Sequence, residues 1–93
     1  MRKSNKSAIK KIQNHLQEHF LPLHPGSKIE VKKGYGKNIH ILIISEDFTG
    51  VSVKQRDEMV WPILEKLPEE ELFRISLCLL WTEEEIPDGV AVY

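Results

Sequence analysis

The N-terminal part of the chain carries an apolar stripe at helical spacing. Between Ser4 and Phe20 the apolar residues that share one side of a helical wheel are Ala8, Ile9, Ile12, Leu16 and Phe20. Lysine, glutamine and asparagine occupy the other side, which is the pattern of an amphipathic helix. We therefore expect a helix over Ser4–Phe20. It should end in segment 21–26, because each of the two prolines there disfavours helix at the residue before it.

A hairpin of two strands is predicted next. Lys28–Lys32 alternates polar and apolar residues, as a half-buried strand does, and its lysines suit a sheet edge. Gly34–Asn38 has turn chemistry, and Ile39–Ser45 follows as a second strand. That second strand is apolar on both faces, which is typical of the middle of a sheet.

The following segment predicts a helix from about Gln55 to Leu67, with Val60, Ile63 and Leu64 facing inward. Pro62 lies inside this segment, so we expect it to kink the helix or to divide it into two short helices. Segment 68–71 should form a loop or a short turn.

Phe73–Trp81 alternates in character and predicts a third strand, in which Arg74, Ser76 and Cys78 share the face away from the helices. Thr82–Glu85 resembles a capped helical turn, with a threonine at the cap and acids in the first turn.

These elements predict one α+β domain over residues 1–93, in the order α-β-β-α-β-α, with residues 1–6 and 88–93 frayed. The helix between the second and third strands is long enough for a parallel crossover. We expect a three-stranded mixed sheet with the helices packed on one face and the second strand in the centre.

Charge is balanced overall but not along the chain. The 93 residues contain 13 basic and 14 acidic side chains, yet residues 1–37 hold nine basic against two acidic, and residues 38–93 hold four against twelve. This asymmetry indicates oriented binding to a partner. The overall balance gives no pull toward nucleic acid or membrane. The chain has one cysteine, no apolar run that could span a bilayer and no signal-peptide pattern, so a cytoplasmic protein is expected.

One stretch of the chain resembles a known family. The run Ile41–Gly50 ends an apolar strand in Ser-Glu-Asp-Phe-Thr-Gly and is followed, after five residues, by Arg56–Val60 and Leu64. This resembles the core signature of BolA-like proteins, and Thr82–Glu85 resembles the family's closing Thr-Pro-Glu-Glu. The resemblance covers most of residues 8–85 in order and spacing, and it implies a fold related to the type II KH domain.

The resemblance also implies a partner and a cofactor. BolA-like proteins help to hold a [2Fe–2S] cluster together with a monothiol glutaredoxin, through a histidine early in the third strand and a ligand in the hairpin loop. Here the strand position is Arg74, which cannot ligate iron, and Gly34–Asn38 contains no ligand-type residue. We therefore expect no cofactor, while a glutaredoxin-like protein stays a candidate partner.

Seven residues are candidates for a partner interface: Arg56, Arg74, Cys78, Lys32, Lys33, Tyr35 and Lys37. Arg56 stands at the family's signature position, but it can equally serve the fold by reaching a carboxylate such as Asp47. Cys78 is either accessible on its strand or part of the packing, as free cysteines most often are. The lysines around Tyr35 can touch phosphates while the ring stacks on a base, or they can be solvated charges at a sheet edge.

The remaining chemistry does not predict an enzyme or a metal site. His15 and His19 share a helix face at the spacing of a zinc pair, and His24 follows, but no convincing further ligands accompany them. No Ser/His/Asp set or phosphate loop is present. Two functions remain: a non-enzymatic BolA-like adaptor that binds another protein, or a KH-like transcriptional regulator that binds nucleic acid weakly through its basic half.

Overall fold

The computed structural model describes residues 5–86. Its elements in chain order are α1 (Asn5–His19), β1 (Lys28–Lys33), β2 (Ile39–Ile44), the 3-10 helix η1 (Glu46–Phe48), α2 (Val53–Leu64), α3 (Glu69–Leu72), β3 (Ile75–Trp81) and the 3-10 helix η2 (Glu83–Glu85). The predicted α+β class and the order α-β-β-α-β-α are confirmed. Of the termini that were expected to fray, residues 1–4 and 88–93 lie outside the described part, and residues 5 and 6 begin α1.

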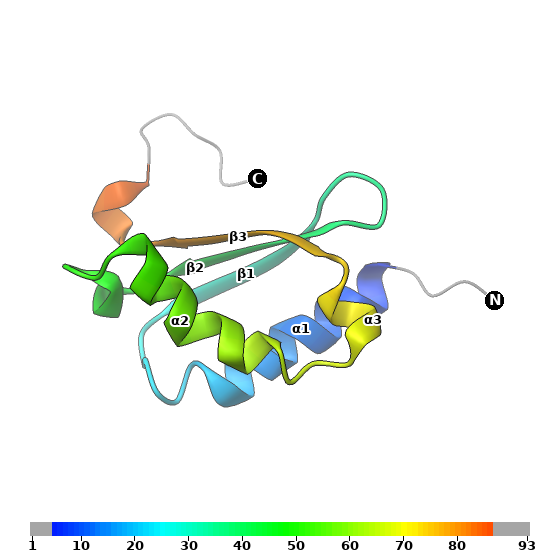
Figure 1. Cartoon of the computed structure of the whole chain (residues 1–93), viewed down its shortest axis with the longest axis horizontal. Coiled ribbons are helices and arrows are strands. Elements are labelled where there is room, and N and C mark those ends of the chain that lie inside the picture. Colours follow the sequence, from blue (N-terminus) through cyan, green and yellow to red (C-terminus); the bar gives the residue numbers. More distant parts are fainter. Residues whose placement is uncertain (1–4, 87–93) are drawn as a thin grey trace.

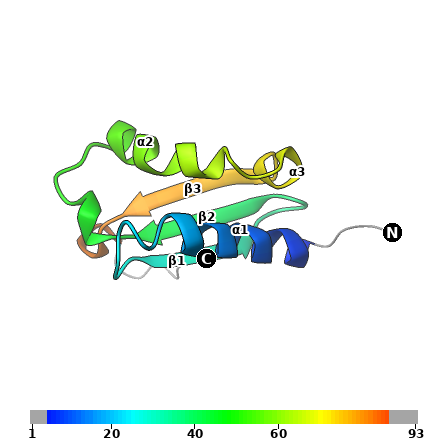
Figure 2. The same cartoon turned by 90° about the horizontal axis from the view of Figure 1, so that it is seen from below.

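The three strands form one mixed sheet in the order β1-β2-β3. β2 lies in the centre, antiparallel to β1 and parallel to β3, as predicted. Helices α1, α2 and α3 all lie on one face of this sheet (Figure 1). Seen from that side, α1 crosses the β1 side of the sheet, whereas α2 and α3 follow β3 (Figure 2).

A continuous apolar core joins the helices to the sheet. The members with 0% exposure come from α1 and the residue after it, from the helix-facing side of β2, from η1 and from α2; they are Ile12, Leu16, Phe20, Ile39, Ile41, Ile43, Phe48, Val60 and Leu64. Full burial of such a side chain stabilises a fold by roughly 1.5–3 kcal/mol. The core is therefore the main reason why the sheet holds its helices. Within the described residues, no helix is long and apolar enough to cross a membrane.

The helices differ from their predicted bounds in two places. α2 begins at Val53 because Ser52 caps it: the Ser52 hydroxyl accepts from the amide of Gln55, whose side chain accepts from the amide of Ser52. The helix passes through Pro62 and ends at Leu64, two residues later. Segment 69–72, expected as a loop or short turn, forms the short helix α3.

The predicted facing of Cys78 is wrong, and a β-bulge explains why. Ile75 pairs with Ile39, but the next residue of β2, His40, pairs with Leu77, so Ser76 is an extra residue without a partner. An extra residue reverses the alternation of side chains beyond it. Cys78 and Leu80 consequently face the helices, and both belong to the core or pack against it.

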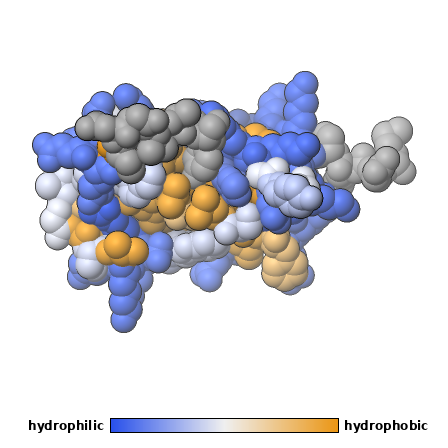
Figure 3. All heavy atoms as spheres, turned by 90° about the horizontal axis from the view of Figure 1, so that it is seen from above, coloured by the Kyte–Doolittle hydropathy of each residue, from blue (hydrophilic) through white to orange (hydrophobic). Residues whose placement is uncertain are grey.

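The other face of the sheet carries side chains from all three strands, and the bulge adds those of β3 beyond Ser76. By register they are Lys28, Glu30 and Lys32 from β1, His40, Leu42 and Ile44 from β2, and Leu77, Leu79 and Trp81 from β3. Figure 3 shows hydrophobic side chains in the middle of this face, bordered by hydrophilic ones.

Candidate functional site

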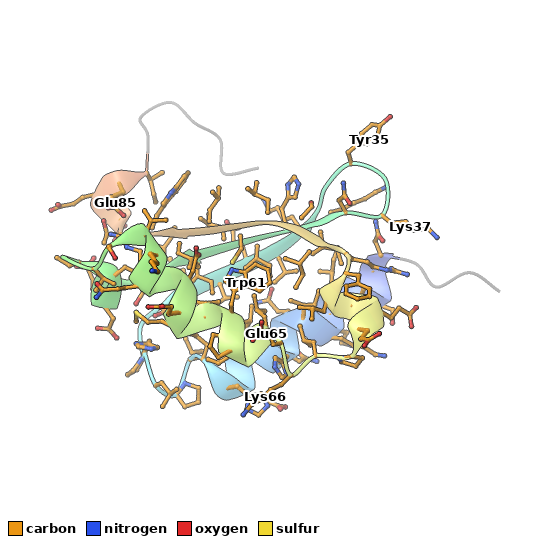
Figure 4. All side chains as sticks on the ribbon, viewed as in Figure 1. Tyr35, Lys37, Trp61, Glu65, Lys66 and Glu85 are labelled. Atoms are coloured by element: carbon orange, nitrogen blue, oxygen red, sulfur yellow. The ribbon has the colours of Figure 1, made fainter. Side chains whose placement is uncertain are left out.

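The candidate interface residues fall into two groups rather than one patch. The residues at or beside the β1–β2 loop, here called the hairpin end, are Lys32, Lys33, Tyr35, Lys37 and Arg74. The other two lie elsewhere: Cys78 is in the middle of β3, and Arg56, in α2, contacts the C-terminal half of that strand. Figure 4 shows Tyr35 at the tip of the loop and Glu85 at the opposite end of the sheet.

At the hairpin end, Asn5 of α1 connects Arg74 to the loop. The guanidinium of Arg74 donates to Oδ1 of Asn5 (3.2 Å), and Nδ2 of Asn5 donates to the carbonyl of Gly36 (2.9 Å). Arg74 also forms an ion pair with Glu70, at 3.6 Å. Its side chain is only 13% exposed, so Arg74 is held by the fold at the position where the resemblance expects a cluster ligand.

The loop itself approaches the sheet closely at one glycine. A Cβ atom added to Gly34 would lie 2.5 Å from Nε2 of His40, so a larger residue would have to displace that ring. Gly36, with φ of +63°, supplies the left-handed residue that the turn needs. Tyr35 between them is 92% exposed, the most exposed large apolar side chain of the described residues.

Arg56 is buried, and a carboxylate holds it, but that carboxylate is Glu85 and not Asp47. Nη1 and Nη2 of Arg56 donate to the two carboxylate oxygens of Glu85, at 2.6 and 3.0 Å. Nη1 also donates to the carbonyl of Leu80 and Nε to that of Val51, both at 2.9 Å. This arrangement ties α2 to β3 and η2, and we call it the Arg56–Glu85 clasp.

The clasp shifts both of its ionisable groups toward their charged forms. Hydrogen bonds from Arg56 and from the Thr82 amide lower the pKa of Glu85 from 4.5 to about 2. The hydrogen bond to Glu85 raises the pKa of Arg56 further, against the opposing effect of burial. Asp47 instead accepts from Nδ1 of His24, at 2.7 Å. The pair Arg56–Glu85 is therefore a fixed ion pair at neutral pH.

A groove lies beside β3, between that strand and the first turns of α2. Its volume is about 330 Å³, and its lining residues are Val53, Arg56, Asp57, Cys78, Leu79, Leu80, Trp81 and Glu85. A second hollow of about 250 Å³, lined by Glu46, Thr49, Gly50, Arg56, Thr82, Glu84 and Glu85, adjoins it at the clasp. Together the two hollows present four carboxylates against one guanidinium, which is already paired.

Cys78 lies in the floor of this groove, half-buried against the core. Desolvation, with a smaller effect of nearby Asp57, raises the pKa of its thiol from 9.0 to about 12. A thiol with such a pKa is protonated at neutral pH and is a poor nucleophile. Cys78 is thus better suited to packing than to covalent chemistry.

The histidines do not assemble into a metal site. His15 bonds to the carbonyl of Ile63 through Nε2 (2.7 Å), and its ring lies 4.6 Å from that of His19. His24 is paired with Asp47. Over residues 5–86 there is no group of three or more His, Cys, Asp or Glu side chains placed to hold a metal ion.

The charge asymmetry of the sequence becomes a separation in space. α1 packs chiefly on β1, so the lysines of both elements lie on one side of the molecule. α2 and α3, which contain acidic residues, follow β3 on the other side (Figure 2), whereas Glu83 of η2 lies 3.9 Å from Lys28 of β1. The groove beside β3 is therefore on the acidic side, and the hairpin loop adjoins the basic side.

Comparison of the chain with protein-family models, with curated proteins and with solved structures finds no match. The resemblance to BolA-like proteins thus remains a prediction that depends on the motifs of residues 41–64 and 82–85.

The sequence alone does not predict the groove, because two of its determinants are not local. The bulge at Ser76 turns Cys78 inward, and the carboxylate that holds Arg56 is 29 residues away in the chain. One signal was present: Thr82-Glu-Glu-Glu85 is a capping-box pattern, and the carboxylate of Glu85 does accept from the amide of Thr82 at 2.8 Å.

Proposed function

We propose that this protein is a non-enzymatic, cytoplasmic adaptor of the BolA-like type that binds another protein and contributes no iron–sulfur ligand of its own. The observation that carries this proposal is the groove beside β3. It is open, contains no activated nucleophile among its lining residues, and carries an exposed apolar side chain at its rim, with Val53 74% exposed. Exposed apolar groups beside a hollow are typical of protein-binding surfaces.

Affinity capture with matched baits tests the proposal. Val53→Arg places a long cation at the rim of the groove, whereas Leu23→Arg makes the same change at an exposed site (67%) away from it. We expect the unmodified protein and Leu23→Arg to retain the same partner from native cytosol, and Val53→Arg to lose it. Equal capture by all three baits, or no specific capture by any, would contradict the proposal.

Nucleic-acid binding is the second candidate function, and one observation favours it. The exposed ring of Tyr35 stands between Lys33 and Lys37 at the tip of the loop, where it can stack on a base while the lysines approach phosphates. A salt titration with random single-stranded DNA and RNA tests this candidate, because phosphate contacts make binding steeply salt-dependent. Submicromolar binding at about 150 mM salt would favour it over the adaptor function.

A further inference from the structure

β3 is an edge strand, and its outward backbone groups have no neighbouring strand among the described residues. The carbonyl of Trp81 accepts from the amide of Ser45, just beyond β2, at 3.0 Å, so the backbone of Trp81 faces β2. Successive residues of a strand direct their backbone groups to opposite sides. Those of Cys78 and Leu80 therefore face away from β2, where the described residues provide no further strand. The carbonyl of Leu80 already accepts from Arg56, so the outward groups that remain for a partner are the amide and carbonyl of Cys78 and the amide of Leu80.

The two edges of the sheet are protected very differently. β1 carries Lys28, Lys32 and Lys33, and charged edges of this kind discourage pairing with other chains. β3 has the sequence Ile-Ser-Leu-Cys-Leu-Leu-Trp, seven residues without a charge or a proline. Its edge is thus the one that would readily accept another strand.

The groove adds specificity to this edge. A strand paired with β3 would direct every second side chain toward α2, into the space bounded by Val53, Asp57 and Cys78. The volume of about 330 Å³ accommodates apolar side chains of moderate size there. The intervening side chains would lie beside Leu77 and Leu79, on the open face.

Charge decides between the possible occupants. Acidic residues flank β3 in the chain: Glu69 and Glu70 in α3 precede it, and Glu83 and Glu84 in η2 follow it. Glu70 is paired with Arg74 and Glu83 with Lys28, so the exposed Glu69 and Glu84 are the carboxylates that can meet the cations of a partner. A second copy pairing antiparallel through β3 would bring the two acidic ends of one copy against those of the other, which is unfavourable. A segment with lysine or arginine at its ends would meet opposite charge at both.

We propose that the free edge of β3 binds an extended, basic peptide segment of a partner protein as a fourth strand, with alternate apolar side chains in the groove against α2. This inference rests on the proposed adaptor function and specifies the chemistry of the partner.

Titration with synthetic peptides, followed by amide shifts of the protein, tests the inference. The probe is Lys-Val-Thr-Val-Arg-Val-Lys, as long as β3, and its charge-reversed control replaces Lys and Arg by Glu. We expect the basic peptide to bind at least about tenfold tighter, which corresponds to roughly 1.4 kcal/mol. The largest shifts should occur at the amides of Cys78 and Leu80.

Two N-methylated forms of the basic peptide test the strand geometry. Each carries methyl groups on one alternate set of backbone amides, so that one form blocks the edge that faces β3 and the other blocks the outer edge. We expect one form to lose binding and the other to retain it. Equal effects of the two forms would overturn pairing through the backbone.

Matched variants of the protein test the charge contribution. Asp57→Asn removes a carboxylate that lines the groove, whereas Glu58→Gln removes its neighbour, which is exposed and does not line it. We expect Asp57→Asn to weaken the basic peptide several-fold and Glu58→Gln to leave it unchanged. Both variants keep the apolar core, so folding is checked by an unchanged amide spectrum elsewhere.

The outcomes separate this inference from the adaptor function. If the peptides do not bind β3 but Val53→Arg still abolishes capture of a protein, the adaptor function stands and the basic-strand partner is wrong. Self-association that perturbs the amides of Cys78 and Leu80 without any peptide would also overturn the inference, in favour of a second copy. Peptide binding as described, without capture of a protein at the groove, would support the strand site and contradict the adaptor function.

Discussion

Single residues at the groove serve the fold more than they serve a partner. The three side-chain nitrogens of Arg56 all donate within the protein, and its guanidinium lies 5.6 Å from the centre of the Phe48 ring. The side chain is 8% exposed, against 43% for Glu85. A partner in the groove would therefore meet the carboxylate of Glu85 rather than the cation. Arg56, which stands at the signature position of the resembled family, therefore stabilises the fold by joining α2 to β3 and η2.

The clasp predicts a specific loss of stability in acid. The pKa of Glu85 is about 2 in the folded protein and near 4.5 without the clasp. A lowered folded pKa gives stability that is present above the unfolded value and is lost as the pH falls through the folded value. We expect the urea midpoint to fall between about pH 4.5 and pH 2, and Glu85→Gln to flatten that part of the curve. Parallel curves for the two proteins would contradict this assignment.

Gly34 predicts a stability change that depends on a second residue. Gly34→Ala places a methyl group against the imidazole of His40 and should destabilise the fold by about 1–3 kcal/mol. In a His40→Ala background the obstacle is absent, so the same change should cost much less. Chemical unfolding of the four proteins of this cycle measures the coupling. An equal cost of Gly34→Ala in both backgrounds would show that the ring is not the cause.

Cys78 predicts slow alkylation in the native state. Its thiol has a pKa raised to about 12 by desolvation and by Asp57, so the reactive thiolate is scarce at neutral pH. We expect iodoacetamide to modify the folded protein far more slowly than the urea-unfolded one. Mass spectrometry of timed samples measures the ratio, and rapid modification of the folded protein would contradict the packing role.

At the scale of elements, the clear apolar patterns of α1 and β2 predicted those elements correctly, whereas the alternation in β3 did not predict which way its side chains face. The stripe of α1 and the doubly apolar β2 were predicted because each follows from burial of local side chains. The parallel pairing of β2 with β3 followed from the length of the crossover. The facing of β3 beyond Ser76 could not be predicted, because a bulge depends on the register with a neighbouring strand. The groove depends on that bulge, so the sequence does not predict the groove either.

The edge position of β3 predicts an alternating pattern of amide exchange. The amides of Leu79 and Trp81 face β2 and are paired, whereas those of Cys78 and Leu80 face outward. Paired amides exchange only when the structure opens. Exchange in D2O monitored by NMR should therefore be faster at Cys78 and Leu80 than at Leu79 and Trp81. Uniform protection of all four would show that something already covers the edge.

At the scale of the whole molecule, the β1 side and the β3 side of the sheet differ in charge and in chemistry. The lysines of α1 and β1 gather on one side, and the acidic groove lies along β3 on the other. The hairpin end, where Asn5 joins Arg74 to the loop, lies at the end of the sheet opposite to Glu85 (Figure 4). A partner bound at the groove would thus leave the basic side and Tyr35 accessible, so the two candidate functions use different surfaces.

The hairpin end predicts how the protein behaves toward an iron–sulfur cluster. The resemblance to BolA-like proteins places a cluster ligand at position 74, but the guanidinium of Arg74 has no lone pair to offer iron and is engaged by Asn5 and Glu70. Cys78 lies four residues further along the chain, about 10 Å along the strand because the bulge removes one rise of 3.3 Å, and it faces the core. We expect that mixing this protein with a cluster-loaded monothiol glutaredoxin leaves the visible absorption and circular dichroism of the cluster unchanged.

The companion variant sharpens this expectation. Arg74→His supplies an imidazole at the strand position, yet Gly34–Asn38 still offers no ligand, so this change alone should not produce the full spectrum of a shared cluster. The double variant Lys37→His, Arg74→His supplies a donor in the loop and a donor at the strand position. We expect this variant to come closest to the full spectrum of a shared cluster. A new mixed-ligand spectrum from the unmodified protein, abolished by replacing one of its histidines or Cys78, would overturn the view that this chain lacks a cluster ligand.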